Sequence, residues 1–254
     1  MEVWRYIDFD LIDPPTSGAV AEAILLARAE GKCPNTVFLY RRKPPAVSIG
    51  YFQSVEKTVD LAACRRLGVE ISRRITGGGA IYSDHNGIIY SVVVGEDHPR
   101  IPKNIAESYE VLCGGVIEAL RILGIDAVFQ PVNDILVGGK KISGSSQTRR
   151  KGVVLHHGTL LIKADIETMK QVLLIPKEKM SDKQARNISE RVTSLEKILG
   201  EPPSIELVKD AIKMGFEKAL GIKLKEGKLT DYEERLVKEL VDDKYSRDEW
   251  NLRR

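Results

Sequence analysis

Apolar residues fall along the chain in two different spacings. Short apolar runs rich in Val, Ile and aromatic residues, and bounded by Gly, Pro or charged residues, are typical of β-strands. They predict strands at about residues 3–9, 36–41, 46–49, 69–73, 80–82, 88–94, 127–130, 134–137, 141–146 and 153–162. Apolar residues three and four positions apart predict helices at about residues 19–30, 59–67, 105–123, 166–173, 194–199, 204–220 and 231–241. Thr230 and Glu233, at the start of the last helix, have the spacing of a capping box.

The order of these elements predicts the fold class. Strands follow one another in the middle of the chain, and helices are interspersed without strict alternation. This order favours an α+β fold with a mixed, mostly antiparallel sheet flanked by helices. At 254 residues the chain is long enough for one sizeable core. We therefore expect a single domain over residues 1–254, with a C-terminal helical segment from about 204 to 254 packed on it.

The overall composition disfavours two classes of partner. The net charge is +3 and charged residues make up 30% of the chain, with both signs interspersed, so nothing indicates a nucleic-acid-binding protein. No apolar run approaches the roughly eighteen residues of a membrane span. The first residues, Met1–Tyr6, lack the charged start and apolar core of a signal peptide. We expect a cytoplasmic protein that binds neither membranes nor nucleic acids.

The most informative segment of the chain is Arg73-Arg74-Ile75-Thr76-Gly77-Gly78-Gly79-Ala80-Ile81-Tyr82. Three consecutive glycines between strands are costly, because glycine loses the most backbone entropy on folding. Such a loop is explained if its backbone approaches a ligand closely. Bare N–H groups beside guanidinium groups suit an anion such as phosphate or carboxylate. A tight turn with solvated arginines is the alternative that this segment alone leaves open.

A second group of polar residues follows further along the chain. Residues 133–144 predict a hairpin with a Gly-Gly turn, with Asp134 near one end and Lys141 near the other. The next strand carries His156 and His157, whose side chains point to opposite faces. A lysine, an aspartate and a glycine–arginine loop suit a reaction that makes an acyl phosphate. Lysine can neutralise charge in the transition state, and aspartate can hold Mg²⁺ beside phosphates.

Together these segments resemble the catalytic domain of lipoate–protein ligase A, within the superfamily of biotin ligases, lipoate ligases and octanoyltransferases. The matching segments are Ser48–Gln53, Arg73–Tyr82, Asn133–Asp134, Lys140–Gly144, His156–Leu160 and Arg191–Thr193. Their order and spacing extend the resemblance over nearly the whole chain. The resemblance implies a biotin/lipoyl ligase-type catalytic fold.

The resemblance also implies an activity and a set of site residues. The activity would be ATP-dependent lipoate–protein ligation, in which ATP and Mg²⁺ activate lipoate to lipoyl-AMP before transfer to a lysine of an acceptor domain. Lys141 would be catalytic and contact the phosphate and carboxylate oxygens, and Asp134 would serve the metal, Mg²⁺, or the ribose-phosphate side. Nucleotide and lipoate binding would fall to Arg74, Thr76, Gly77, Gly78, Gly79, Ala80, Ile81, Tyr82, Asn133, Lys141, Gly144 and His157.

Two other functions stay open at this point. One is an octanoyl or lipoyl acyltransferase that acts between carrier proteins without ATP. Related octanoyltransferases use a cysteine nucleophile shortly before the lysine hairpin, and residues 127–134 contain none. Because a thioester-forming enzyme needs a thiolate in reach, this absence favours ATP-dependent activation. The other is a non-catalytic lipoyl-binding module, which the presence of Lys141, Arg74 and the glycines disfavours.

The implied partners are an acceptor lipoyl domain of a 2-oxoacid dehydrogenase or glycine-cleavage type protein, and a second polypeptide. Longer ligases of the family carry an additional C-terminal domain, whereas this chain ends at Leu252-Arg253-Arg254. We therefore expect a separate small accessory subunit.

Two further expectations concern single segments. The family's histidine after the glycines is Ser83 here, and the neighbouring His85 is a candidate replacement. The basic run with Lys177, Lys179, Lys183 and Arg186 is expected to close over the acyl-adenylate, with Arg191 at its end.

Overall fold

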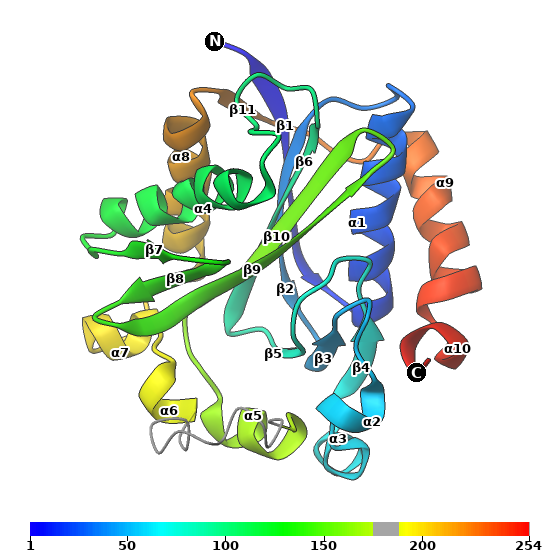
Figure 1. Ribbon diagram of the computed structural model, residues 1–254, viewed down its shortest axis with the longest axis vertical. Helices are drawn as coiled ribbons and strands as arrows, with labels where there is room; N and C mark the ends of the chain where they lie inside the picture. The colour runs from blue at the N-terminus through cyan, green and yellow to red at the C-terminus, as the bar shows by residue number, and fades with distance from the viewer. Residues whose placement is uncertain (175–187, 254) are drawn as a thin grey trace.

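The computed structural model describes residues 1–174 and 188–253, which form two β-sheets covered by helices (Figure 1). The larger sheet has eight strands in the order β11-β1-β2-β6-β10-β9-β8-β7, and the smaller has the order β4-β3-β5. Strand β1 pairs in parallel with β11 and β2, and β3 with β4, whereas the other neighbouring pairs are antiparallel. The predicted α+β fold with a mixed, mostly antiparallel sheet is confirmed. The strands are β1 Val3–Ile12, β2 Thr36–Arg42, β3 Ala46–Ile49, β4 Glu70–Arg73, β5 Ile81–Ser83, β6 Gly87–Gly95, β7 Val128–Gln130, β8 Asp134–Val137, β9 Lys140–Arg150, β10 Val153–Leu161 and β11 Lys223–Glu226.

The helices lie on both faces of the larger sheet. In Figure 1, α4 and α8 cover one face, while α1 lies on the other with α9 beside it. Of the shorter helices, α3 and α5 pack against the smaller sheet, α6 and α7 lie beside the larger one, and α10 lies beside β4. The bounds are α1 Pro14–Ala29, α2 Val55–Thr58, α3 Leu61–Leu67, α4 Ile105–Ile122, α5 Ile166–Val172, α6 Ile188–Arg191, α7 Leu195–Leu199, α8 Ile205–Leu220, α9 Asp231–Leu240 and α10 Asp248–Asn251, with a π-helical turn, η3, at Val241–Tyr245.

Strand β6 lies near the centre of the larger sheet, and all nine of its residues are buried. Its apolar side chains alternate between two cores, because successive strand residues point to opposite faces. Tyr90 and Val92 belong to the core under α4 and α8, whereas Ile89 and Val93 belong to the core under α1. A third core joins the smaller sheet to α3 and α5. The strand is therefore buried on both faces.

Helices α4 and α8 cross where each carries a glycine. A β-carbon on Gly215 would lie 2.2 Å from the carbonyl oxygen of Gly115, so only glycine permits this approach. The close crossing buries Phe216 and Leu112 in the shared core. Residues beyond 204 thus pack on the sheet through α8 and on α1 through α9. The assignment of residues 1–254 to one domain stays a prediction.

The structure differs from the sequence-based elements at a few boundaries. Helix α1 begins at Pro14, five residues before the predicted start, because Asp13 caps it by accepting a hydrogen bond from Thr16 N and proline suits the first turn. The capping box of Thr230 and Glu233 is present as predicted. Strand β11 was not predicted, because Leu224 is its one buried residue and gives no alternation to detect.

No helix within residues 1–174 and 188–253 is long and apolar enough to cross a membrane.

Candidate active site

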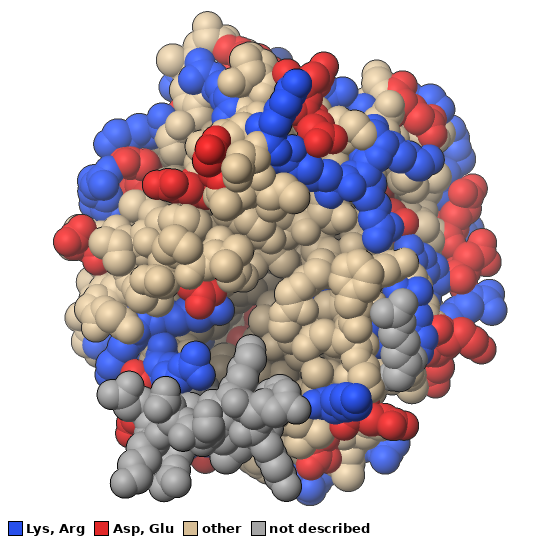
Figure 2. Space-filling view, in the orientation of Figure 1, with Lys and Arg blue, Asp and Glu red and all other residues tan. Residues whose placement is uncertain are grey.

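A cleft of about 420 Å³ lies between the larger sheet and the smaller one. Its walls come from β9 and β10 on one side and from the glycine segment and β5 on the other. Apolar side chains such as Ile81, Tyr82, Leu161 and Met169 line it together with serines, arginines and other polar side chains. Figure 2 shows a hollow near the middle of this face, with lysine and arginine side chains beside it. A cavity of this size, in which apolar surface and convergent polar groups meet, is typical of a ligand site.

The glycine segment touches the end of β3 through its backbone. A β-carbon on Gly50 would lie only 2.0 Å from the carbonyl oxygen of Gly78. Tyr51 N also donates to the carbonyl of Thr76 at 2.8 Å. The backbone of the glycine segment therefore approaches the loop before α2 closely, and the predicted approach to a ligand stays a prediction.

Arg74 holds this glycine segment in place. Its guanidinium donates to the carbonyl oxygens of Gly77 at 2.7 Å, Gly79 at 2.8 Å and Ser48 at 2.8 Å. A fourth bond, from Nε, reaches Thr76 Oγ1 at 3.0 Å. Burial lowers the pKa of Arg74 to about 10, and the charge of nearby Arg42 adds to the effect. Arg74 lines the cleft, but these contacts show it shaping the loop, so the predicted anion contact stays a prediction.

Lys141 and Asp134 form an ion pair across the β8–β9 hairpin, with Nζ 2.6 Å from Oδ1. The side chain of Lys141 crosses Gly144, where a β-carbon would lie 2.5 Å from both Cε and Nζ. Gly144 is therefore the residue that gives Lys141 its path into the cleft. Both charged groups are partly exposed, so the pair is accessible from the cleft side.

Thr76 and His157 link the glycine segment to β10. Thr76 Oγ1 lies 2.7 Å from His157 Nε2 and 3.0 Å from Ser146 Oγ. Thr76 Oγ1 already accepts a hydrogen bond from Arg74. The hydroxyl proton of Thr76 can therefore be donated to either His157 or Ser146. Burial, with the charge of Arg74, holds the pKa of His157 well below its usual value. His157 is therefore a neutral, weakly basic imidazole that can accept or donate a hydrogen bond but does not carry charge at pH 7.

His156 points to the opposite face, as the strand alternation predicted. It is fully buried against the rings of Tyr90 and Tyr109, and burial lowers its pKa to about 3. It belongs to the core.

The buried histidines predict acid instability. In the unfolded chain His156 and His157 bind protons at their usual pKa near 6.5. In the folded state the pKa of each is lower, so protonation there requires a lower pH. The unfolded state thus binds more protons, so the stability is complete above pH 6.5 and falls as the pH drops toward 3. Each group contributes a slope of about 1.4 kcal/mol per pH unit. Urea unfolding from pH 7.5 to 4.5 should show a shallower dependence for His156→Phe than for wild type. The exposed His85→Gln variant is the control, and an unchanged slope in His156→Phe would contradict the assignment.

Most of the predicted site residues line the cleft. Those that do are Arg74, Gly78, Gly79, Ala80, Ile81, Tyr82, Asn133, Lys141, Gly144 and His157. Three do not line it, and each contacts a residue that does: Thr76 bonds His157, Gly77 bonds Arg74, and Asp134 pairs with Lys141. Among the described residues no group of three or more His, Cys, Asp or Glu could hold a metal ion, and the Mg²⁺ role of Asp134 stays a prediction.

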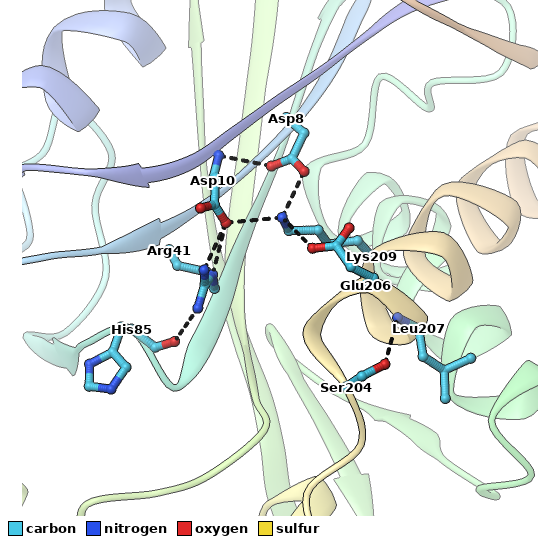
Figure 3. Close-up of polar contacts among 8 residues, drawn as sticks. All are labelled: Asp8, Asp10, Arg41, His85, Ser204, Glu206, Leu207 and Lys209. Carbon is cyan, nitrogen blue, oxygen red and sulfur yellow. Dashed lines mark hydrogen bonds and ion pairs between the residues drawn. The ribbon is translucent and has the colours of Figure 1, made fainter.

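The sequence missed several cleft residues. Tyr40, Arg42, Ser145 and Ser146 line the cleft and carried no motif, whereas Ser48 and Ser143 lie in segments that match the family but were not predicted as site residues. Ser83 also lines it, with its buried hydroxyl lacking a partner among described atoms. His85 is exposed and is not among the described residues that line the cleft, and its backbone carbonyl accepts from Arg41 (Figure 3). Its role as a replacement for the imidazole of the family pattern stays a prediction.

The network around Arg41 has a structural role. Lys209 of α8 binds Asp8 and Asp10 at an irregularity in β1, and Asp10 also binds Arg41 (Figure 3). None of these residues lines the cleft. Of the predicted basic loop, Lys177, Lys179, Lys183 and Arg186 lie outside the described residues, and Arg191 lines the cleft.

The three cysteines are all buried, and none lines the cleft. Cys113 comes nearest, with Sγ 3.5 Å from Oγ of Ser145, a residue of the cleft wall. Burial raises the pKa of Cys33 to about 12 and those of Cys64 and Cys113 to about 11. At neutral pH these thiols are protonated and weakly reactive.

In the described part of the chain, a cleft between two sheets carries Lys141, a glycine segment and a buried imidazole, an arrangement that fits a catalytic domain of the lipoate ligase type. The sequence matches the family model of the lipoyl protein ligase A/B catalytic domain over residues 13–217. The chain belongs to this family.

Relatives of known name fall into two groups. Octanoyltransferase LipM of Geobacillus kaustophilus is 38% identical, with 100% of this chain and 99% of the relative covered. Further relatives that match the whole chain carry the same name. Among solved structures, a bipartite lipoate protein ligase of Thermoplasma acidophilum is similar with a TM-score of 0.86 and 34% identity, covering 99% of this chain and 97% of that one. A lipoate-protein ligase A bound with ATP has a TM-score of 0.85 and 33% identity, with 99% of both chains covered.

These comparisons correct the predicted main function. ATP-dependent lipoate ligation is contradicted by the curated relatives, which are octanoyltransferases over the full length of the chain. The absence of a cysteine at residues 127–134 does not exclude acyl transfer. An amine can attack a carrier thioester directly, so an acyltransferase does not require a thiol of its own. The coarser prediction, an enzyme of the lipoate ligase and octanoyltransferase family, is confirmed.

Proposed function

We propose that the chain transfers a medium-chain acyl group, octanoyl or lipoyl, from a carrier-protein thioester to a lysine of an acceptor lipoyl domain. The observation that carries the proposal is its similarity to octanoyltransferases over the whole chain. The cleft supports it physically. A volume of about 420 Å³ with apolar walls at Ile81, Leu161 and Met169 suits a medium-length hydrocarbon chain.

Lys141 has the chemistry that such a transfer needs. The acceptor amine attacks the thioester carbonyl, the C–N bond forms, and the C–S bond breaks to release the carrier thiol. The carbonyl oxygen becomes negative in between, and a fixed ammonium group beside it lowers that barrier. The positive charges of Lys141 and Arg74 also disfavour a protonated acceptor lysine, so they increase the fraction of neutral amine that can attack.

His157 has a different part in the proposal. Its depressed pKa makes it a poor proton acceptor, so it does not serve as the general base. Through Thr76 it fixes the glycine segment against β10 and keeps that wall of the cleft rigid. Asp134 holds Lys141 at 2.6 Å and so orients its ammonium group. The predicted ATP and Mg²⁺ have no part in this proposal.

A thiol of the enzyme has no part in it either. With Cys33, Cys64 and Cys113 all outside the cleft lining, the acyl group would pass directly from the carrier thioester to the acceptor amine. We predict that a triple Cys→Ala variant, and native protein treated with iodoacetamide, keep most of their transfer activity. Mass spectrometry would follow both alkylation and any covalent acyl-enzyme. Loss of activity in step with alkylation of one cysteine would contradict direct transfer.

The partners complete the proposal. The acceptor is a lipoyl domain of a 2-oxoacid dehydrogenase or glycine-cleavage type protein, and the donor is an acyl thioester on a carrier protein. The accessory subunit was expected for the ligase activity and has no part in this proposal. Transfer by this chain alone would contradict the need for it.

The deciding experiment uses purified chain, an octanoyl carrier-protein thioester and a lipoyl domain, with nucleotides removed enzymatically and EDTA present. We expect the lipoyl domain to gain one octanoyl group in mass, and no gain when its acceptor lysine is replaced by arginine. Acylation from free octanoate or lipoate that requires ATP and Mg²⁺, together with ATP–pyrophosphate exchange and no transfer from the thioester, would overturn the proposal.

A further inference from the structure

Arg42, at the end of β2, is a buried guanidinium with only neutral partners. Arg42 is only 5% exposed. It donates to the hydroxyls of Ser17 at 2.9 Å, Tyr40 at 3.3 Å and Ser72 at 3.4 Å, while its buried Nε has no partner among the described atoms. Burying a cation without a counter-charge is costly, and in proteins such groups are normally paired.

A second positive charge lies close to it. The charge of Arg42 lowers the pKa values of both Arg74 and His157, after the larger effect of burial. Arg73 also faces this region, although its guanidinium donates to several backbone carbonyls. Among described residues no carboxylate comes within 4.0 Å of Arg42 or Arg74. The charge of Arg42 does lower the pKa of Glu70, but burial raises that pKa by more. The buried guanidinium of Arg42 and the partly exposed one of Arg74 thus line one small cavity together with hydroxyls and a neutral imidazole.

A small cavity of about 20 Å³ lies among these groups. It is lined by the basic residues, by three serines and by the first turns of α1, as follows: Ser17, Gly18, Ala21, Tyr40, Arg42, Ser48, Ser72, Arg73, Arg74, Ile75 and His157. Such a volume exceeds the roughly 10–15 Å³ that one water needs, and it is too small for a phosphate or a nucleotide. Five of its residues also line the acyl cleft, so it lies directly behind the cleft wall.

We propose that this cavity is a binding site for a small monovalent anion of the size of chloride. A water could bond Arg42 Nε but would leave two like charges uncompensated in a low-dielectric site. An anion satisfies Nε, accepts from the serine hydroxyls and offsets the repulsion between Arg42 and Arg74. Since Arg74 holds the glycine segment, the bound anion would stabilise the wall of the cleft. This inference is independent of which acyl reaction the cleft performs.

Two measurements on the whole chain test the site. The first is a crystal structure in bromide, with anomalous scattering used to locate the ion, and a bromide peak within hydrogen-bond distance of Arg42 Nε is expected. The second is thermal unfolding at constant ionic strength, with chloride replacing gluconate, which is too large for the cavity. We expect Tm to rise saturably by on the order of 3 °C between zero and 0.2 M chloride, as for a ligand that binds only the folded state.

Variants separate this site from general salt effects. Arg42→Gln should abolish the chloride dependence of Tm, whereas Arg41→Gln, which removes the neighbouring arginine that binds Asp10 outside the cavity, should retain it. If Arg42→Gln does not fold, the wild-type bromide structure decides alone. A cavity that contains only water, or a Tm rise that is equal in Arg42→Gln and wild type, would overturn the proposal.

Discussion

Replacing Lys141 with alanine is expected to reduce acyl transfer by about two to three orders of magnitude while leaving the fold intact, the size of loss seen when one oxyanion-stabilising group is removed. Lys141 is the lysine that lines the cleft within the described chain; its side chain is 38% exposed, and its Nζ is held by Asp134. Its loss removes the fixed positive charge beside the carbonyl oxygen. It removes little buried surface, so we expect the urea midpoint to stay close to that of wild type.

The control for this prediction is Lys140→Ala. Lys140 is exposed on the same strand and does not line the cleft, so the substitution makes the same chemical change beside the site. The transfer rate should be measured with saturating acceptor domain and octanoyl thioester. A Lys141→Ala rate within tenfold of wild type, with Lys140→Ala equal to wild type, would show that Lys141 does not stabilise the reacting carbonyl.

Asp134 should show a smaller effect of the same kind. Asp134→Asn keeps the side-chain shape but removes the charge that orients Lys141, so the rate should fall by less than it does in Lys141→Ala. The double variant should be no slower than Lys141→Ala, because the aspartate acts through the lysine.

Several parts of this molecule could be predicted from the sequence because they depend on neighbours along the chain. The Gly138-Gly139 turn requires two residues with positive φ, and the structure has φ values of 54° and 76° there. The hairpin that carries Asp134 and Lys141 follows from that turn and from the flanking apolar runs. The alternation of His156 and His157 on β10 follows from strand geometry alone.

The parts that could not be predicted depend mostly on contacts between distant segments. Arg42 looks like any arginine at a strand end, and its burial depends on Ser17 of α1 and Ser72 of β4. Arg74 binds the nearby carbonyls of Gly77 and Gly79, and its contact with the carbonyl of Ser48 requires the fold to bring β3 beside it. The choice between acyl activation and acyl transfer depended on the meaning of one absent cysteine, and sequence chemistry alone allows both routes.

Arg73 is the clearest example of a role that the sequence does not reveal. It is 1% exposed, and its guanidinium donates to the carbonyl oxygens of Gly50 at 2.9 Å and Gln53 at 2.7 Å on one side. On the other side it donates to the carbonyls of Trp250 at 3.2 Å and Arg253 at 2.6 Å. It therefore joins the loop that touches the glycine segment to the segment around α10, which lies beside β4 in Figure 1.

The backbone of Arg73 takes part in the same junction. Its N–H donates to Asn251 Oδ1 at 2.9 Å, and its carbonyl accepts from Trp250 Nε1 at 2.8 Å. Asn251 is itself fixed by donating to the carbonyl of Tyr245 at 2.8 Å. These hydrogen bonds hold residues 245–253 against β4, the strand that leads into the glycine segment. The side chain and the backbone of one residue thus connect the last described residues to the wall of the cleft.

We therefore expect Arg73→Met to lower the free energy of unfolding by about 3–5 kcal/mol, because it leaves one buried carbonyl, that of Gly50, and several part-buried ones without a donor. Arg65→Met, an exposed arginine on α3, is the control and should change the stability by less than about 0.5 kcal/mol. Asn251→Ala should lower the free energy of unfolding by less than Arg73→Met does. The double variant should lower it by less than the sum of the two single effects, since both act on one junction.

Hydrogen exchange should become faster together in residues 50–53, 74–80 and 245–253 of Arg73→Met. A loss below 1 kcal/mol, or faster exchange confined to residues 245–253, would show that this junction does not support the cleft.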